Sequence, residues 1–267
     1  MSDLLPGLFR GLCPGLCSIS FRELTPEAII SLCHESGLEC IEWGSDIHAP
    51  AGDEIAAHAL AKRCSEVGLS CPSYGSYFFA GRDPVDELPP LLDTAAALGA
   101  KTVRIWAPFG IGPDAAPSER TQVVDAICDA ALLASERDLS LALEFHPGTL
   151  TETAASTLDL LSSLGENVFS YWQPVAGATT ALSVSELSLV HPRLAHLHVF
   201  SWDPTPTDRQ PLDHLESMWR AAIRLALRDR GFPAPRCAYL EYLPNDDPDA
   251  LRRDAAVLVQ WIKEESA

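Results

Sequence analysis

Eight short apolar runs separated by helical patterns are the feature that most restricts how this chain can fold. Each run is followed by helix signals, as at Thr25, where a capping residue precedes a proline and an acid. Strands that alternate with helices pair in parallel through right-handed crossovers, and eight such units close into a barrel. We therefore predict a (β/α)8 TIM barrel that forms a single domain over residues 1–267. The expected strands are residues 15–21, 40–44, 70–76, 102–107, 140–146, 168–173, 194–200 and 237–243.

A doubly wound open sheet is the alternative, because it shows the same alternation of strands and helices. Its dinucleotide-binding form carries Gly-x-Gly-x-x-Gly after the first strand, and this sequence has no such motif there. The length of 267 residues also fits one barrel, which typically needs about 250 residues.

The charge balance limits the partners of the chain. It has 37 acidic and 19 basic residues, a formal net charge of −18, which repels phosphate backbones and anionic lipids. We expect no nucleic-acid or membrane partner, and we see no signal peptide and no apolar run of 18 residues. The eight cysteines form no Cys-x-x-Cys pair, which predicts reduced thiols in a cytoplasmic protein. Helix faces rich in Ala and Leu fit the core or a homo-oligomer interface equally well.

Charged residues near the carboxyl ends of the expected strands indicate a functional site. Both faces of a parallel barrel strand are covered, so such strands should be apolar, and that end of the barrel carries the chemistry. Glu144, His198 and Glu241 lie near the ends of the fifth, seventh and eighth expected strands. Because a buried carboxylate without a partner is costly, a divalent cation shared by these three side chains is the interpretation we favour.

Other polar residues on the strands have simpler explanations. Glu42 on the second strand could pair with Arg22 or Arg104 instead of taking part in chemistry. His196 is expected to be a hydrogen-bonded interior histidine and not a ligand.

With these residues identified, the chain resembles the xylose-isomerase-like TIM-barrel superfamily of sugar isomerases and epimerases. The resemblance runs from Ser18 to Trp261. In the epimerase branch that it resembles, a Glu, an Asp, a His and a Glu at strand ends bind one divalent metal. The resemblance thus implies Glu144, His198 and Glu241 as ligands, with Gln173 at the aspartate position as a departure. The segments that carry it are Ile41–His48, Leu143–His146, Tyr171–Pro174, His196–His198 and Leu240–Tyr242.

Two carboxylates, one imidazole and one amide suit Mn²⁺ or Mg²⁺, with Co²⁺ and Zn²⁺ as alternatives. The expected reaction removes the proton next to a sugar carbonyl and returns one through an enediolate, with Glu144 and Glu241 as the catalytic pair. Basic residues do not cluster strongly in the strand-end loops, which favours a free sugar, cyclitol or keto-glycoside over a sugar phosphate. The candidate substrate-binding residues are Asp46, His48, Tyr77, Arg104, His146 and Trp202.

Two other functions remain open. The same metal chemistry could end in elimination, which would make the protein a lyase, dehydratase or deglycosidase acting on a keto-sugar, keto-inositol or keto-glycoside. Gln173 mildly favours such a divergent activity. The barrel could also bind a sugar without turning it over.

Overall fold

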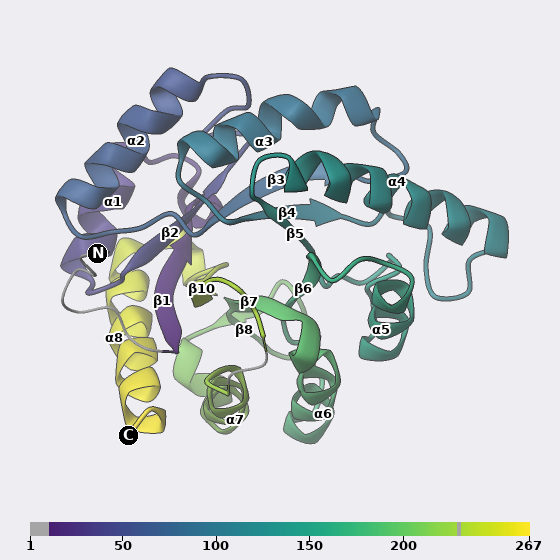
Figure 1. The fold of residues 1–267 in the computed structure, drawn as a ribbon. Helices are drawn as coiled ribbons and strands as arrows, with labels where there is room; N and C mark the ends of the chain where they lie inside the picture. Colours follow the sequence, from purple (N-terminus) through teal and green to yellow (C-terminus); the bar gives the residue numbers. More distant parts are fainter. Residues whose placement is uncertain (1–10, 229–230) are drawn as a thin grey trace.

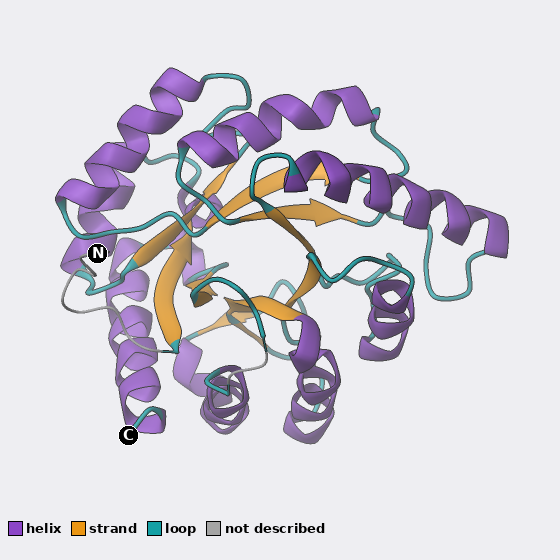
Figure 2. Cartoon of the chain, in the orientation of Figure 1, coloured by secondary structure: helices purple, strands orange, loops and turns teal. Residues whose placement is uncertain are grey.

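Eight parallel strands close into a barrel in the computed structural model, which describes residues 11–228 and 231–267. Around the barrel the strands follow the order β1-β10-β7-β6-β5-β4-β3-β2, so the first and last strands are neighbours. The predicted (β/α)8 fold is confirmed, and the alternative of an open doubly wound sheet is wrong (Figure 2). The barrel strands are β1 (Leu12–Cys17), β2 (Cys40–Gly44), β3 (Ser73–Phe79), β4 (Thr102–Trp106), β5 (Ser140–Leu143), β6 (Val168–Trp172), β7 (Leu194–Val199) and β10 (Arg236–Leu240).

The helices surround the barrel and connect successive strands (Figure 1). The predicted caps hold: Thr25 Oγ1 accepts a hydrogen bond from Ala28 N at 3.3 Å, and Thr153 Oγ1 accepts one from Ser156 N at 3.2 Å. The helices are α1 (Pro26–Glu35), α2 (Glu54–Glu66), α3 (Leu88–Ala97), α4 (Pro117–Ser135), α5 (Ala154–Ser162), α6 (Thr180–Val190), α7 (Glu216–Ala226) and α8 (Pro248–Glu265).

Short elements add to this frame. The connection from β7 to α7 contains a two-stranded antiparallel pair, β8 (Ser201–Trp202) and β9 (Arg209–Gln210). Among the described residues, no helix is long and apolar enough to span a membrane. The 3-10 helices are η1 (Ser18–Phe21), η2 (Val85–Glu87), η3 (His191–Arg193), η4 (Leu212–Leu215) and η5 (Pro244–Asp246).

Three predicted strand boundaries are wrong by several residues. The first strand ends at Cys17, and the apolar residues after it form η1. The third strand starts at Ser73, where its ladder with β4 begins. The fifth ends at Leu143, shortly before Pro147, which has no N–H to donate to a ladder. An apolar run indicates that a segment is buried, whereas a strand also needs a hydrogen-bonded neighbouring strand.

The core has two parts. The larger cluster packs the outward strand residues against the helices. The smaller one, which consists of strand residues, fills the barrel interior with small thiols and aromatic rings, including Cys13, Cys40, Cys237, Tyr171 and Tyr239. All eight cysteines are free thiols, as predicted.

Candidate functional site

The four residues proposed as metal ligands lie at the carboxyl ends of four strands that are adjacent in the barrel. Glu144, Gln173 and Glu241 directly follow β5, β6 and β10, and His198 lies near the end of β7. All four side chains are buried. The barrel order thus brings together residues that lie up to almost one hundred positions apart in the sequence.

Three oxygen atoms surround one nitrogen of His198. Its Nδ1 lies 3.2 Å from Glu144 Oε1, 3.2 Å from Gln173 Oε1 and 3.5 Å from Glu241 Oε2. A single N–H at this nitrogen cannot satisfy three acceptors. Within the described part of the chain, Glu241 Oε2 and Glu144 Oε2 are also buried without a hydrogen-bond partner. Such a donor set fits a hard divalent cation.

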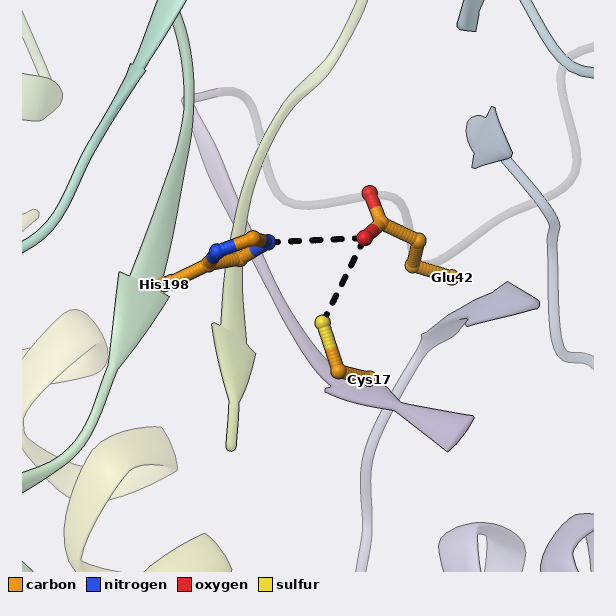
Figure 3. Close-up of side chains that lie close together, drawn as sticks. All are labelled: Cys17, Glu42 and His198. Carbon is orange, nitrogen blue, oxygen red and sulfur yellow. Dashed lines mark hydrogen bonds and ion pairs between the residues drawn. The ribbon is translucent and has the colours of Figure 1, made fainter. Parts of the chain in front are cut away.

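The other nitrogen of His198 faces a second buried carboxylate. Its Nε2 lies 3.4 Å from Glu42 Oε1, and the same oxygen is 3.2 Å from Arg104 Nη1 (Figure 3 shows the histidine and the glutamate). Of the two partners weighed for Glu42, Arg104 is therefore the one observed, while Arg22 pairs with Asp46. The Arg104 guanidinium also lies 3.5 Å from His198 Nε2.

Glu42 and Arg104 are held by further contacts. The Tyr171 hydroxyl donates to Glu42 Oε2, and the thiol of Cys17 lies 3.4 Å from Glu42 Oε1. Arg104 Nε lies 3.4 Å from Glu144 Oε2, so the guanidinium bridges two acids. Cys17, Glu42 and His198 form a set whose ligand atoms all lie within 4.8 Å of one another (Figure 3). The site thus offers two positions for a cation, one on each side of the imidazole.

The buried charges act strongly on one another. Burial raises the pKa of Glu241 to about 7, although His198 partly opposes this rise. Burial also disfavours the ionised form of Glu144 and of Glu42, but the neighbouring cationic His198 and Arg104 outweigh it and lower the pKa of both carboxyls. A divalent ion beside Glu241 would stabilise its ionised form and lower its pKa.

His196, two residues before His198, is the interior histidine that we expected. Its Nδ1 accepts a hydrogen bond from the backbone N–H of Cys237 at 3.1 Å. Burial lowers its pKa to about 3, so the ring is neutral.

The predicted substrate-binding residues separate into an inner and an outer group. Arg104 lies among the acids of the site. The ring of Tyr77 lies above it, with the Arg104 Cζ atom 5.6 Å from the ring centre, and stacks on Trp106 at 6.3 Å. A cavity of about 650 Å³ is lined by Tyr77 on β3, Arg209 on β9, and residues of the segments after β1 and β10, Arg22 among them. This cavity adjoins the candidate site through Tyr77.

The remaining predicted contacts lie around the rim. His48 Nδ1 is 2.9 Å from Ser18 Oγ. His146 Nδ1 lies 2.8 Å from the carbonyl of Pro147, and its ring packs on Trp106 and not on the acids. The ring of Trp202 packs on Tyr242, with 4.6 Å between ring centres.

The sequence analysis missed the parts played by Cys17 and Tyr171. Cys17 pairs with Glu42 across β1 and β2, and Tyr171 on β6 lies two residues before Gln173 and on the same face. The side chains of Cys17 and Tyr171 therefore point into the barrel, where both contact Glu42. The alternation of inward residues along these strands could have placed both beside Glu42.

Comparison with known proteins then defines the family. Residues 30–264 match the family model described as a xylose isomerase-like TIM barrel. The chain belongs to this family. No curated protein matches the sequence.

Solved structures share the fold at low sequence identity. One is described as the probable 3-DHS dehydratase AsbF from Bacillus anthracis, with 20% identity and a TM-score of 0.72 over 93% of this chain and 99% of that one. An L-ribulose 3-epimerase has 16% identity and a TM-score of 0.72, with 95% of each chain covered. A xylose isomerase-like TIM-barrel protein from Mycobacterium smegmatis, in complex with magnesium, has 16% identity and a TM-score of 0.70, with coverages of 96% and 98%. At these identities the likeness shows the fold alone.

Proposed function

We propose that this protein is a divalent-metal-dependent sugar or keto-sugar isomerase or epimerase. The observation that carries the proposal is the convergence of Glu144, Gln173 and Glu241 oxygens on His198 Nδ1 at 3.2–3.5 Å. One imidazole nitrogen, two carboxylates and one amide favour Mn²⁺ or Mg²⁺ as the ion. The magnesium complex of the Mycobacterium smegmatis family member supports a metal in this fold.

The two glutamates would supply the acid–base chemistry. When bound, the divalent ion would polarise a substrate carbonyl and stabilise negative charge that develops on its oxygen. Glu144 follows β5 and Glu241 follows β10, and these strands lie on opposite sides of β7 in the strand order, so the two carboxylates approach His198 Nδ1 from different strands. One carboxylate would take the proton from the carbon next to the carbonyl, and the other would return a proton. Return to the same carbon on the opposite face would give epimerisation, and return to the neighbouring carbon would give isomerisation.

The surroundings of the site favour a neutral carbohydrate. Arg104, the arginine nearest the carboxylates, is already paired with Glu42 and Glu144, and Arg22 is paired with Asp46. These pairs leave little free positive charge for a phosphate. Tyr77 and Trp202 present aromatic surface at the rim, on which a sugar ring could stack.

The first prediction concerns the two glutamates. Glu144→Gln and Glu241→Gln should each lower the turnover rate of a ketose at least about a hundredfold, because an amide cannot exchange the substrate proton. Circular dichroism and the melting temperature should show that both variants still fold. Removal of metal with EDTA should abolish wild-type turnover, and added Mn²⁺ should restore it. Wild-type activity in either variant would contradict the two-glutamate scheme.

Elimination is the second candidate function. Gln173 favours it, because this neutral residue stands where the family resemblance implies an aspartate ligand. The structural neighbour described as a probable dehydratase shows that this fold also occurs with such an assignment. Product analysis separates the two reactions, because only elimination releases water or an aglycone from the substrate.

A further inference from the structure

We propose that Glu42 is a positioning residue for His198 and that the cation it binds is Arg104 and not a second metal ion. The proposal rests on the function proposed above, because it treats His198 as a metal ligand through Nδ1. It assigns a role to Glu42, a buried carboxylate beside His198 that the ligand set does not use. On this proposal Cys17, Glu42 and His198, whose ligand atoms lie within 4.8 Å of one another, are held together by contacts within the protein and not by a metal ion.

The direction of the hydrogen bonds around His198 determines where its protons lie. An ionised carboxylate can only accept, so the contact of 3.4 Å between Glu42 Oε1 and His198 Nε2 requires a proton on Nε2. Arg104 Nη1 lies 3.2 Å from Glu42 Oε1 and 3.5 Å from His198 Nε2, so the Arg104 N–H donates to Glu42 and not to His198. Without metal, Nδ1 also lies 3.2 Å from the carboxylate of Glu144, so the ring carries a proton on both nitrogens. A divalent ion at the Glu144, Gln173 and Glu241 oxygens would displace the Nδ1 proton and leave a neutral imidazole with its proton on Nε2 and its lone pair on Nδ1. That lone pair faces the three candidate oxygen ligands, as metal binding requires.

The carboxylate of Glu42 is held in place by its neighbours. Its other oxygen accepts from the Tyr171 hydroxyl. The Glu42 carboxylate also packs directly on Gly75 of β3. A Cβ added at Gly75 would lie 3.1 Å from Glu42 Oε1 and 3.2 Å from Arg104 Nη2. A carboxylate fixed in this way holds the imidazole ring in one orientation.

The charges of the buried cluster balance with a single divalent ion. The buried acids Glu42, Glu144 and Glu241 carry three negative charges when ionised. Arg104 and one divalent ion carry three positive charges, and a neutral His198 and Gln173 add none. One metal ion therefore neutralises the cluster, whereas a second ion on the Nε2 side would leave two unbalanced positive charges in a buried site. The guanidinium already lies against Glu42 and His198 on that side.

The test measures Mn²⁺ affinity in the full chain by isothermal titration, for wild type, Glu42→Gln and Cys17→Ala. Loss of an outer carboxylate behind a ligating histidine typically weakens metal binding by about 10–100-fold, and we expect this for Glu42→Gln. Cys17→Ala is the matched control, since it removes the third member of the same cluster. It should change the affinity by less than about threefold, because a thiol is only a weak donor to Glu42.

Two further measurements separate positioning from general damage. Thermal melting of the metal-free proteins reports whether Glu42→Gln folds. Tyr171→Phe removes one hydrogen-bond donor to Glu42 but leaves the charge of Glu42 in place, so it should weaken Mn²⁺ binding by a smaller factor than Glu42→Gln does. In ¹⁵N-histidine spectra with Mg²⁺ bound, wild-type His198 should show its proton on Nε2. Glu42→Gln should shift this histidine toward a mixture of tautomers.

The outcomes are distinct. Equal Mn²⁺ affinity of wild type and Glu42→Gln would overturn the positioning role and leave the proposed function intact. Weakening by Cys17→Ala as large as that by Glu42→Gln would overturn it too, by placing the metal on the Nε2 side. If the wild-type chain bound no Mn²⁺, the proposed function would fail, and the role of Glu42 with it.

Discussion

Gln173 is the residue at which this chain departs from the acid set that its family resemblance implies. Its amide oxygen lies 3.2 Å from His198 Nδ1, the same distance as that of the Glu144 oxygen from this nitrogen. An amide oxygen can bind a hard cation, but it brings no charge. With Gln173 neutral, the remaining acids balance Arg104 and one divalent ion. The substitution therefore fits the charge of the whole buried cluster.

Gln173→Asp should have two opposite effects. The added charge attracts the cation, so Mn²⁺ should bind about tenfold more tightly, a gain of about 1.4 kcal/mol. Without metal, an additional buried carboxylate has no cation to balance it, so the variant should lose about 1–3 kcal/mol of unfolding free energy. Titration calorimetry and urea unfolding measure the two effects. Gln173→Leu, the control, should weaken binding, and Mn²⁺ affinities unchanged in both variants would show that Gln173 is not a ligand.

The sequence predicts which residues of the site point inward but not how deep they lie. Glu144, His198 and Glu241 follow from the position of each on its strand and from the cost of buried charge. For Arg104 the sequence allows both a substrate contact and a pairing with Glu42, and the structure places its side chain between Glu42 and Glu144. The alternation of residues fixes the face of a strand, whereas the reach of a long side chain along the barrel axis depends on strand tilt and register. A single sequence does not contain that information.

At the scale of the elements, β1 shows what the apolar pattern leaves out. Its predicted start at residue 15 misses Leu12 to Pro14, which pair with β10. Pro14 and Gly15 interrupt the apolar run there, although all six residues of the strand are buried. Gly15 pairs with both Cys40 and Tyr239 and allows the two neighbouring strands to approach.

Gly15→Ala should destabilise the barrel strongly. A Cβ at this position would lie 2.5 Å from the Cys40 sulfur, 2.8 Å from the Cys40 carbonyl oxygen and 2.8 Å from the Tyr239 ring. The carbonyl belongs to the neighbouring strand and cannot rotate away, so we expect a loss of about 1–3 kcal/mol or more in urea unfolding. Gly112→Ala, whose Cβ would meet no atom within 4 Å, is the control and should change stability by less than about 0.5 kcal/mol. Equal stability of the two variants would show that β1 and β2 are not as close as described.

At the scale of the whole molecule, closure of the barrel is what assembles the site. The strand order β10-β7-β6-β5 places the four candidate ligands on consecutive strands, although α5, α6 and α7 separate these strands in sequence. The eightfold alternation predicted this closure, because eight strand–helix units leave no open edge. The net charge of −18 also draws cations to the surface in general, so binding alone does not locate a metal.

The most direct test of the central claim is therefore the position of the ion in a crystal soaked with Mn²⁺, read from an anomalous difference map. We predict a single strong peak about 2 Å from His198 Nδ1 and from the oxygens of Glu144 and Glu241, with the Gln173 amide oxygen completing the set. A peak between Glu42 and Cys17, or no peak in the barrel, would contradict the account.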